Sequence, residues 1–348
     1  MTSIERFYAT IENKPVDRPA CWLGDPTPEA AKKLCAYYNV PNVSELKKIC
    51  GDDFYAVEIP YHSPTCNAIF AAFDWYGNDC DVDVEERTLT TPGVFADCLD
   101  VDDAEALDFQ WPDPEKYIDP AECRRLVEEA PEGKIVMGML WAAHFQDTCA
   151  AFGMENCLMN MISEPELVHY VDDKVVDFYL RAMKVFLEAT KGKIHALLIG
   201  NDIGSQLSLM ISPKLVAEFV IPGAKKLVEL AHSYGVKVVY HSCGAIRDAI
   251  PMLIEAGVDI IHPIQALAAG MEPKGLKESF GDQVAFCGGV DTQQLLPNGT
   301  PEQVMEKVRQ LREIFPTGLI ISPSHEALQA DVPPENIKAM FDEAGKIY

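Results

Sequence analysis

The stretch Val236-Lys237-Val238-Val239-Tyr240-His241-Ser242-Cys243-Gly244 combines a fold signal with a chemical signal. Its apolar run, residues 236–240, is typical of a strand buried on both faces. His241 and Cys243 are two residues apart, so they point the same way along the pleat where the strand ends. Imidazole and thiolate are ligands that zinc prefers. We therefore expect a buried strand with two metal ligands at its carboxyl end.

Similar apolar runs recur along the chain and predict eight strands, at 20–23, 54–59, 135–140, 196–199, 236–240, 259–262, 284–287 and 319–321. Helical periodicity lies between the later runs, at 213–232, 245–256 and 301–315. Thr300-Pro301-Glu302-Gln303 and Ser163-Glu164-Pro165-Glu166 are typical helix starts. Eight alternating units predict a (β/α)8 TIM barrel. The alternative is an open doubly wound sheet, but no G-x-G-x-x-G follows a predicted strand.

The same pattern predicts one barrel domain over residues 1–348, with a helical segment at the N-terminus. Residues 63–132 are rich in Asp, Pro and Trp and lack clear periodicity. We expect them to form an irregular insertion that covers part of the barrel.

Composition limits the possible partners and location. The formal net charge of −25 disfavours binding to nucleic acid or to an anionic membrane surface. No apolar run approaches the roughly 18 residues that a membrane span needs, and no export signal precedes the first helix. The 11 cysteines are scattered without a C-x-x-C pair. These features predict a cytoplasmic protein with free thiols.

Active sites of TIM barrels lie at the carboxyl ends of the strands. There, His241 and Cys243 can meet His325, which follows the last predicted strand. These three residues are the expected metal ligands, and they leave a fourth position open, as in catalytic zinc sites. Cys287 is a reserve ligand. The alternative for His241 and Cys243 is a core thiol beside a hydrogen-bonded imidazole.

Other polar residues follow the predicted strands and are candidates for catalysis or substrate binding. Asp202 and His144 are the candidate catalytic residues, because either could move a proton. Asp202 could instead cap the helix after it, and so could the candidate substrate-binding residue Asp291. The expected substrate-binding residues are Trp141, Gln206, Gln265, Asp291 and Gln293.

The chain resembles the uroporphyrinogen decarboxylase superfamily over nearly its whole length. The likeness is carried by these motifs: Glu5-Arg6-Phe7, Pro15-Val16-Asp17-Arg18-Pro19, Gly200-Asn201-Asp202-Ile203-Gly204-Ser205-Gln206, Ile211-Ser212-Pro213, His241-Ser242-Cys243-Gly244, Gly288-Gly289-Val290-Asp291-Thr292-Gln293 and Asp331-Val332-Pro333-Pro334-Glu335-Asn336. The resemblance implies a TIM barrel, and within the superfamily the zinc- and corrinoid-dependent methyltransferases are the branch most similar to this chain.

Two departures from the superfamily patterns bear on function. The decarboxylases carry an arginine-rich N-terminal segment that holds substrate carboxylates, but this chain has Cys21-Trp22-Leu23-Gly24-Asp25-Pro26 there. The methyltransferases bind zinc through His-x-Cys and a later Cys. The first two positions match His241 and Cys243, whereas His325 stands at the third. Replacing a thiolate by an imidazole makes the metal a stronger Lewis acid.

The resemblance therefore implies a methyltransferase that uses Zn²⁺. Its substrate is expected to be a small methylated compound, such as a methoxylated aromatic. No histidine lies in the Asp-x-His-x-x-Gly pattern of corrinoid carriers, so the cobalamin is expected on a separate corrinoid protein. Two alternatives are a metal-independent decarboxylase and a non-catalytic corrinoid- or tetrapyrrole-binding protein.

Overall fold

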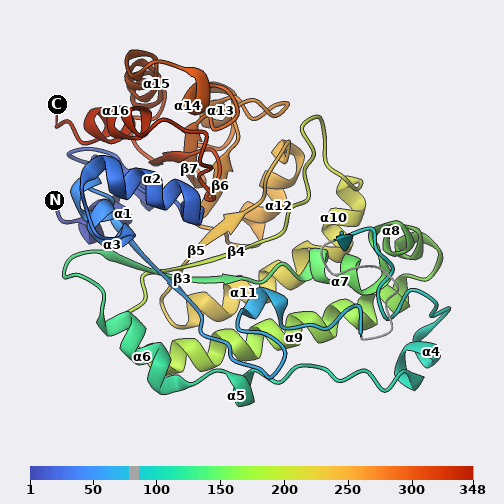
Figure 1. The fold of residues 1–348 in the computed structure, drawn as a ribbon. Coiled ribbons are helices and arrows are strands. Elements are labelled where there is room, and N and C mark those ends of the chain that lie inside the picture. The colour runs from blue at the N-terminus through green and yellow to red at the C-terminus, as the bar shows by residue number, and fades with distance from the viewer. Residues whose placement is uncertain (78–85, 348) are drawn as a thin grey trace.

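A computed structural model describes residues 1–77 and 86–347. Its centre is an eight-stranded parallel sheet with the order β1-β8-β7-β6-β5-β4-β3-β2. The sheet curls into a nearly closed TIM barrel, with helices packed around the strands (Figure 1). The expected barrel is confirmed. No helix among the described residues is long and apolar enough to span a membrane.

The strands begin and end close to the predicted positions. They are β1 (Ala20–Cys21), β2 (Phe54–Glu58), β3 (Ile135–Trp141), β4 (Ala196–Gly200), β5 (Lys237–His241), β6 (Ile260–Ile264), β7 (Ala285–Val290) and β8 (Leu319–Pro323). Adjacent strands pair in parallel register, with Gly200 opposite His241 and His241 opposite His262. The pairing therefore sets the ends of β4, β5 and β6 side by side.

Helices connect the strands and cover the outside of the barrel. They are α1 (Ser3–Ile11), α2 (Pro28–Tyr38), α3 (Val43–Cys50), α4 (Val101–Ala106), α5 (Pro114–Tyr117), α6 (Pro120–Glu128), α7 (His144–Phe152), α8 (Met154–Ser163), α9 (Pro165–Thr190), α10 (Pro213–Phe219), α11 (Ile221–Ser233), α12 (Ile250–Glu255), α13 (Pro273–Phe280), α14 (Leu295–Asn298), α15 (Pro301–Ile314) and α16 (Pro334–Ala344). Two short 3₁₀ turns are η1 (Ile69–Ala71) and η3 (Arg247–Ala249). The N-terminal helical segment is α1.

Three of the helix predictions differ in detail from the structure. Residues 213–232 form two helices, because Pro222 supplies no backbone N–H at the break and instead begins the first turn of α11. Residues 245–256 form η3 followed by α12, which has Pro251 in its first turn. The expected cap Ser163 is the last residue of α8, so α9 begins after Glu164 without a side-chain cap. The predicted capping box of Thr300 and Gln303 is present at α15.

The expected insertion, residues 63–132, contains η1, α4, α5 and α6, joined by irregular segments. Part of the predicted region, residues 78–85, lies outside the described residues. η1 carries Phe70, which is 61% exposed and lines the pocket at the barrel mouth. The segment therefore contributes an aromatic side chain to that mouth.

The interior of the barrel is filled by apolar side chains from alternate strand positions. Their inner cluster includes Phe54, Met137, Leu198, Val239, Ile260, Ala285 and Ile320. A second, larger apolar cluster lies between the strands and the helices. The interior is thus a packed core, and the predicted site lies at the carboxyl end of the barrel.

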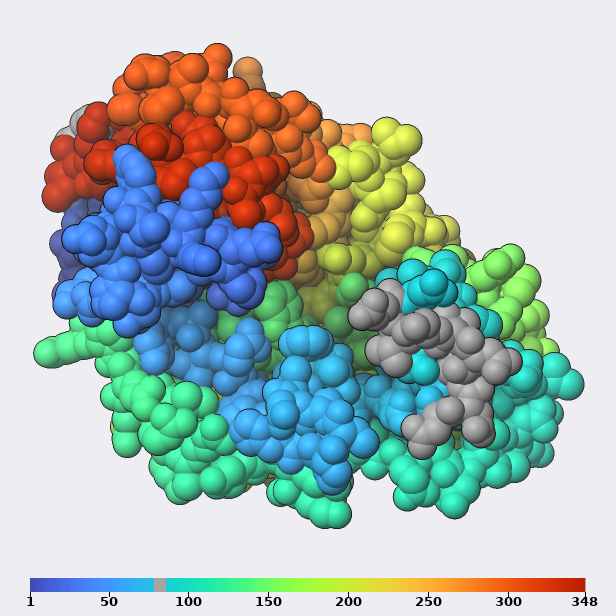
Figure 2. Space-filling view, in the orientation of Figure 1, coloured from blue at the N-terminus to red at the C-terminus, as the bar shows by residue number. Residues whose placement is uncertain are grey.

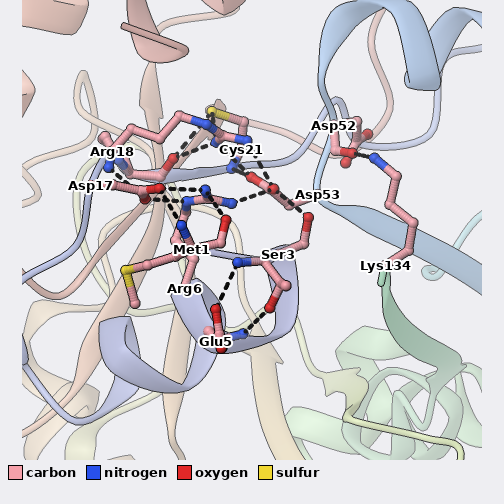
Figure 3. Close-up of polar contacts among 12 residues, drawn as sticks. Met1, Ser3, Glu5, Arg6, Asp17, Arg18, Cys21, Asp52, Asp53 and Lys134 are labelled. Atoms are coloured by element: carbon pink, nitrogen blue, oxygen red, sulfur yellow. Dashed lines mark hydrogen bonds and ion pairs between the residues drawn. The ribbon is translucent and has the colours of Figure 1, made fainter. Parts of the chain in front are cut away.

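A buried ionic cluster holds the N-terminal segment against the opposite end of the barrel (Figure 3). The carboxylate of Asp53, 1% exposed, accepts hydrogen bonds from Arg6, Arg18, Ser3 Oγ and the backbone N–H of Cys21. Asp17 pairs with Arg6 at 2.8 Å. Asp53 directly precedes β2 and Cys21 ends β1. The cluster therefore connects β1 and β2, the two edge strands of the sheet.

Candidate functional site

The predicted metal ligands meet at the carboxyl end of the barrel. His241 Nε2 lies 3.5 Å from Cys243 Sγ. The rings of His241 and His325 are 6.2 Å apart between centroids, and the nearby Cys243 thiol raises the pKa of His325. The side chains come from the end of β5 and from the segment after β8. The structure therefore brings His241 and Cys243 into contact, with the His325 ring beside them.

Asp202 joins this group from the end of β4. Its Oδ1 lies 3.3 Å from His241 Nε2 and accepts a hydrogen bond of 2.8 Å from the backbone N–H of Cys243. Asp202, His241 and Cys243 place one ligand atom each within 4.8 Å of one another. An oxygen, a nitrogen and a sulfur donor at this spacing suit Zn²⁺.

His241 uses its other ring nitrogen on the buried side. His241 Nδ1 lies 3.3 Å from Glu326 Oε2 and 2.9 Å from His262 Nδ1. His262 is fully buried, and Glu326 is 8% exposed. A carboxylate on the far nitrogen of a metal-binding imidazole fixes its tautomer and orientation. His241, His262 and Glu326 also place ligand atoms within 4.8 Å of one another, but all three are buried. The Nε2 side, where Asp202, Cys243 and His325 are partly open to solvent, is the more accessible of the two sides.

The electrostatics of the cluster favour a thiolate and a carboxylate. Burial opposes ionisation of the Cys243 thiol, but hydrogen bonds with His241 and His325 lower its pKa below the ordinary value. Burial likewise opposes ionisation of Asp202, yet the hydrogen bond with His241 lowers its pKa to about 2. Two anionic donors beside two imidazoles would balance the charge of a bound Zn²⁺.

Glycine at the end of the motif is required by close packing. Gly244 has φ +86°, and a Cβ there would lie 2.4 Å from the carbonyl oxygen of Gly204. Its N–H donates to Gln265 Oε1 at 2.7 Å. This close approach of the two backbone segments fixes the chain directly after Cys243. It explains why the motif ends in glycine.

Trp141 forms one wall of the mouth in a strained backbone conformation. Trp141 and Ala142 have φ values of +63° and +50°, which non-glycine residues rarely adopt. The indole lies edge-on to the His241 ring at 6.2 Å. Together with Phe70 it lines a pocket of about 280 Å³, which also includes Ala143, Gln146, Gly200, Asp202, His241 and Glu326.

The two predicted catalytic residues differ in their placement, and that of His144 needs correction. His144 is not in the mouth: the turn at Trp141 and Ala142 carries it into the helix layer, where it is fully buried and bonds Asp172 at 2.7 Å. Asp202 is in the mouth, as predicted, and its low pKa makes its carboxylate a proton acceptor at neutral pH.

The predicted substrate-binding residues differ in their placement. Asp291 caps the chain after β7, accepting from the backbone N–H groups of Gln293, Gln294 and Leu295. Gln206 is exposed, and its backbone oxygen accepts from Ala269. Gln265, Gln293 and His325 share a separate pocket of about 230 Å³ beside the mouth. Of these five predicted residues, only Trp141 lines the pocket that contains His241.

The reserve ligand Cys287 points into the barrel interior. It is 2% exposed and belongs to the inner apolar cluster. Burial raises the pKa of its thiol above the ordinary value. The structure does not place it with His241 and Cys243, because alternation along β7 directs it to the packed core.

Two carboxylates, one in the mouth and one beside it, were not among the predicted site residues. Glu326 directly follows His325, and adjacency to a candidate ligand was the signal that could have found it. Glu58 ends β2 and accepts a hydrogen bond of 3.3 Å from Trp141 Nε1. Although Glu58 is open to solvent beside the mouth, partial desolvation raises its pKa to about 7 in spite of the bond from Trp141.

Comparison with known proteins identifies the family. The model of the uroporphyrinogen decarboxylase (URO-D) family matches residues 2–347. The chain belongs to the URO-D family. This confirms the predicted resemblance, and the eight-stranded barrel is the fold that the family was expected to bring.

Similar proteins include methyltransferases. A methylated-thiol–coenzyme M methyltransferase from Methanosarcina mazei is 27% identical over 191 residues, which are 54% of this chain and 47% of that protein. The match thus spans about half the length of this relative. A solved methyltransferase from Methanosarcina mazei has a TM-score of 0.71 at 15% identity and covers 99% of this chain and 98% of its own.

A more distant structure shares the barrel. The putative vitamin-B12 independent methionine synthase from Listeria monocytogenes has a TM-score of 0.51 at 10% identity, covering 96% of this chain and 98% of its own. At these identities the two solved structures show the shared fold.

Proposed function

We propose that this chain is a zinc-dependent methyltransferase. It would move a methyl group between a small methylated compound, a methoxylated aromatic in the first instance, and the cobalt of a separate corrinoid protein. The observation that carries the proposal is the convergence of Asp202, His241 and Cys243 at the barrel mouth, with the His325 ring 6.2 Å from that of His241. The 27% identical methyltransferase supports the reaction class.

The four side chains would hold the metal at the Nε2 side of His241. Bound there, Zn²⁺ would supply a Lewis acid for the heteroatom that carries or receives the methyl group. Glu326 would accept the His241 Nδ1 proton and so keep Nε2 free of hydrogen. The Asp202 carboxylate would accept the backbone N–H of Cys243 and would also face the metal at the Nε2 side of His241.

The mouth suits a flat aromatic substrate. Trp141 and Phe70 offer two ring systems in a pocket of about 280 Å³. Aromatic pairs prefer stacked or edge-to-face contacts that orient a ring. In demethylation, the bond between oxygen and methyl carbon breaks, the methyl passes to the corrinoid partner, and the oxygen left behind takes a proton. Glu58 would hold that proton near neutral pH.

The test combines metal analysis with a methyl-transfer assay. Freshly purified protein should contain about one Zn²⁺ per chain. With a corrinoid protein supplied, it should demethylate a methoxylated aromatic. Cys243→Ser and His241→Ala should lose both metal and activity. Cys35→Ser and His169→Ala are matched controls on the outer helices α2 and α9, and they should keep both.

Two results would overturn the proposal. One is a metal content unaffected by Cys243→Ser. The other is full methyl transfer by metal-free protein.

A further inference from the structure

The barrel wall has a seam between its first and last strands. β1 contains two residues, and among the described residues no ladder joins it to β2. One backbone hydrogen bond, from Asp53 N–H to the Cys21 carbonyl at 2.9 Å, crosses at the lower end. Above this bond Ala56, in the middle of β2, remains partly exposed. The wall is therefore open where the other seven strand pairs are closed by ladders.

A pocket of about 230 Å³ occupies this seam. From the inner side of the barrel it is lined by Phe54, Ala56, Glu58 and Met139. From the outside, Lys47 and Lys48 of α3 and Lys134 before β3 line it. Figure 2 shows the surface recessed between the dark-blue N-terminal helices and the lighter blue segment below them. The exposed Asp25 also lines the pocket. The pocket is thus mainly apolar inside, with Glu58 at one end, and its rim has three lysines and one aspartate.

The seam pocket adjoins the mouth through one hydrogen-bonded pair. Glu58 lines the seam pocket, whereas Trp141 lines the mouth pocket that contains His241. The two side chains are joined by the 3.3 Å bond from Trp141 Nε1 to Glu58 Oε2. Rotation of these two side chains would connect the pockets without moving a strand.

Charge separates the two openings. The described residues that line the mouth pocket include Asp202 and Glu326 but no Lys or Arg. The seam pocket has three lysines against the carboxyl groups of Asp25 and Glu58, in a chain whose net charge is −25. An anion approaching the molecule is therefore repelled at the mouth and attracted at the seam. Lys47 is half-buried, which strengthens its effect on a ligand in the pocket.

We propose that the seam between β1 and β2 is a lateral binding and entry site for an aromatic carboxylate that carries the methyl group. The ring would lie against Ala56 and Met139, and the carboxylate would pair with Lys47 and Lys48. This inference rests on the proposed function and adds the substrate's charge and its route. A side entrance would admit the substrate while a corrinoid protein covers the mouth.

Binding of two matched compounds tests the seam directly. The probes are 3-methoxybenzoate and its uncharged counterpart 3-methoxybenzamide, titrated calorimetrically into zinc-loaded protein without a corrinoid partner. In the Lys47→Gln/Lys48→Gln double variant, the Kd for the benzoate should rise about tenfold relative to the Kd for the benzamide. Lys32→Gln, an exposed lysine on the neighbouring helix α2, is the matched control and should keep the wild-type ratio.

A second variant locates the ligand. Ala56→Leu fills the seam from the middle of β2 and should weaken binding of both probes. An unaltered ratio in the lysine variant, or unaltered binding in Ala56→Leu, would overturn the seam as the site. These binding measurements need no methyl transfer, so they test the seam even if the proposed reaction is wrong. Conversely, a negative result at the seam would not contradict the proposed methyl transfer.

Discussion

His241 makes different contacts with its two ring nitrogens. Nε2 faces Asp202 and Cys243, and Nδ1 faces Glu326 and His262. Burial by itself would lower the pKa of His241, but the nearby Glu326 carboxylate raises it well above the ordinary value. A positive ring would compete with a metal, so metal binding and proton release should be linked at this residue.

Glu326 is expected to act through His241 and not as a direct ligand. Glu326→Gln keeps the shape of the side chain but removes its negative charge, which weakens its hold on the Nδ1 proton. Zinc affinity should fall about 10- to 100-fold, the usual range for an outer-shell carboxylate. Competition with a chromophoric chelator would measure it. Glu335→Gln, an exposed change at the start of α16, is the control, and an equal loss there would contradict the role.

Glu58 should govern the pH dependence of methyl transfer. Burial raises its pKa to about 7, so the proton is held below that pH and lost above it. If the proton is needed by the departing oxygen, kcat/KM should decline as pH rises through about 7. Glu58→Gln should lower kcat/KM and remove this decline. A variant profile that still falls at the same pH would assign the proton to another group.

Sequence reasoning was most successful where side-chain type and strand position agree. His241, Cys243 and His325 were predicted to lie near one another because soft ligands followed predicted strands, and their side chains do lie at the same end of the barrel. The predicted position of His144 was wrong because a strained turn at Trp141 and Ala142 redirects the chain. No local sequence pattern predicts a left-handed conformation at Trp or Ala. Glu326 was missed because its role depends on which nitrogen of His241 it faces, a tertiary contact that spacing does not encode.

At the scale of elements, the N-terminal motifs serve the structure and not the site. Arg6 lies on α1, and Asp17 and Arg18 precede β1, yet all three converge beneath the barrel on Asp53 or its neighbours (Figure 3). The resemblance includes these motifs, but the sequence alone does not say that they lie at the opposite end from His241. This ionic cluster connects β1 and β2 below the seam, where the other neighbouring strands are connected by backbone hydrogen bonds.

Removing the Asp53 carboxylate from the buried ionic cluster should destabilise the fold. Asp53→Ala leaves Arg6 and Arg18 buried or nearly so without their shared carboxylate. We expect the free energy of unfolding to fall by about 3–5 kcal/mol, as for a broken buried ion pair. Urea denaturation followed by circular dichroism measures it. Asp282→Ala, whose side chain is 97% exposed, should cost less than about 0.5 kcal/mol. Similar losses in both variants would contradict this role of the cluster.

At the scale of the whole molecule, the eight strands were predicted within a few residues of their observed ends. Repetition made this possible, since the later apolar runs alternated with helical patterns and eight such runs predict a closed barrel. The seam was not predicted, because a strand of two residues and a strand of five give the same kind of apolar signal in sequence. Pairing between distant segments decides where a barrel stays open.

The proposed metal would also connect distant parts of the molecule. Its ligands follow β4, β5 and β8, so unfolding must separate them. Zn²⁺ should therefore stabilise the native barrel by mass action, by about 2.7 kcal/mol when the free metal is 100 times its Kd. The measurable result is a higher Tm in buffered zinc than in excess chelator. Cys243→Ala should fold with the same far-ultraviolet dichroism but lose this rise. If the variant gained the same rise in Tm as the wild type, zinc would be binding elsewhere on the acidic surface.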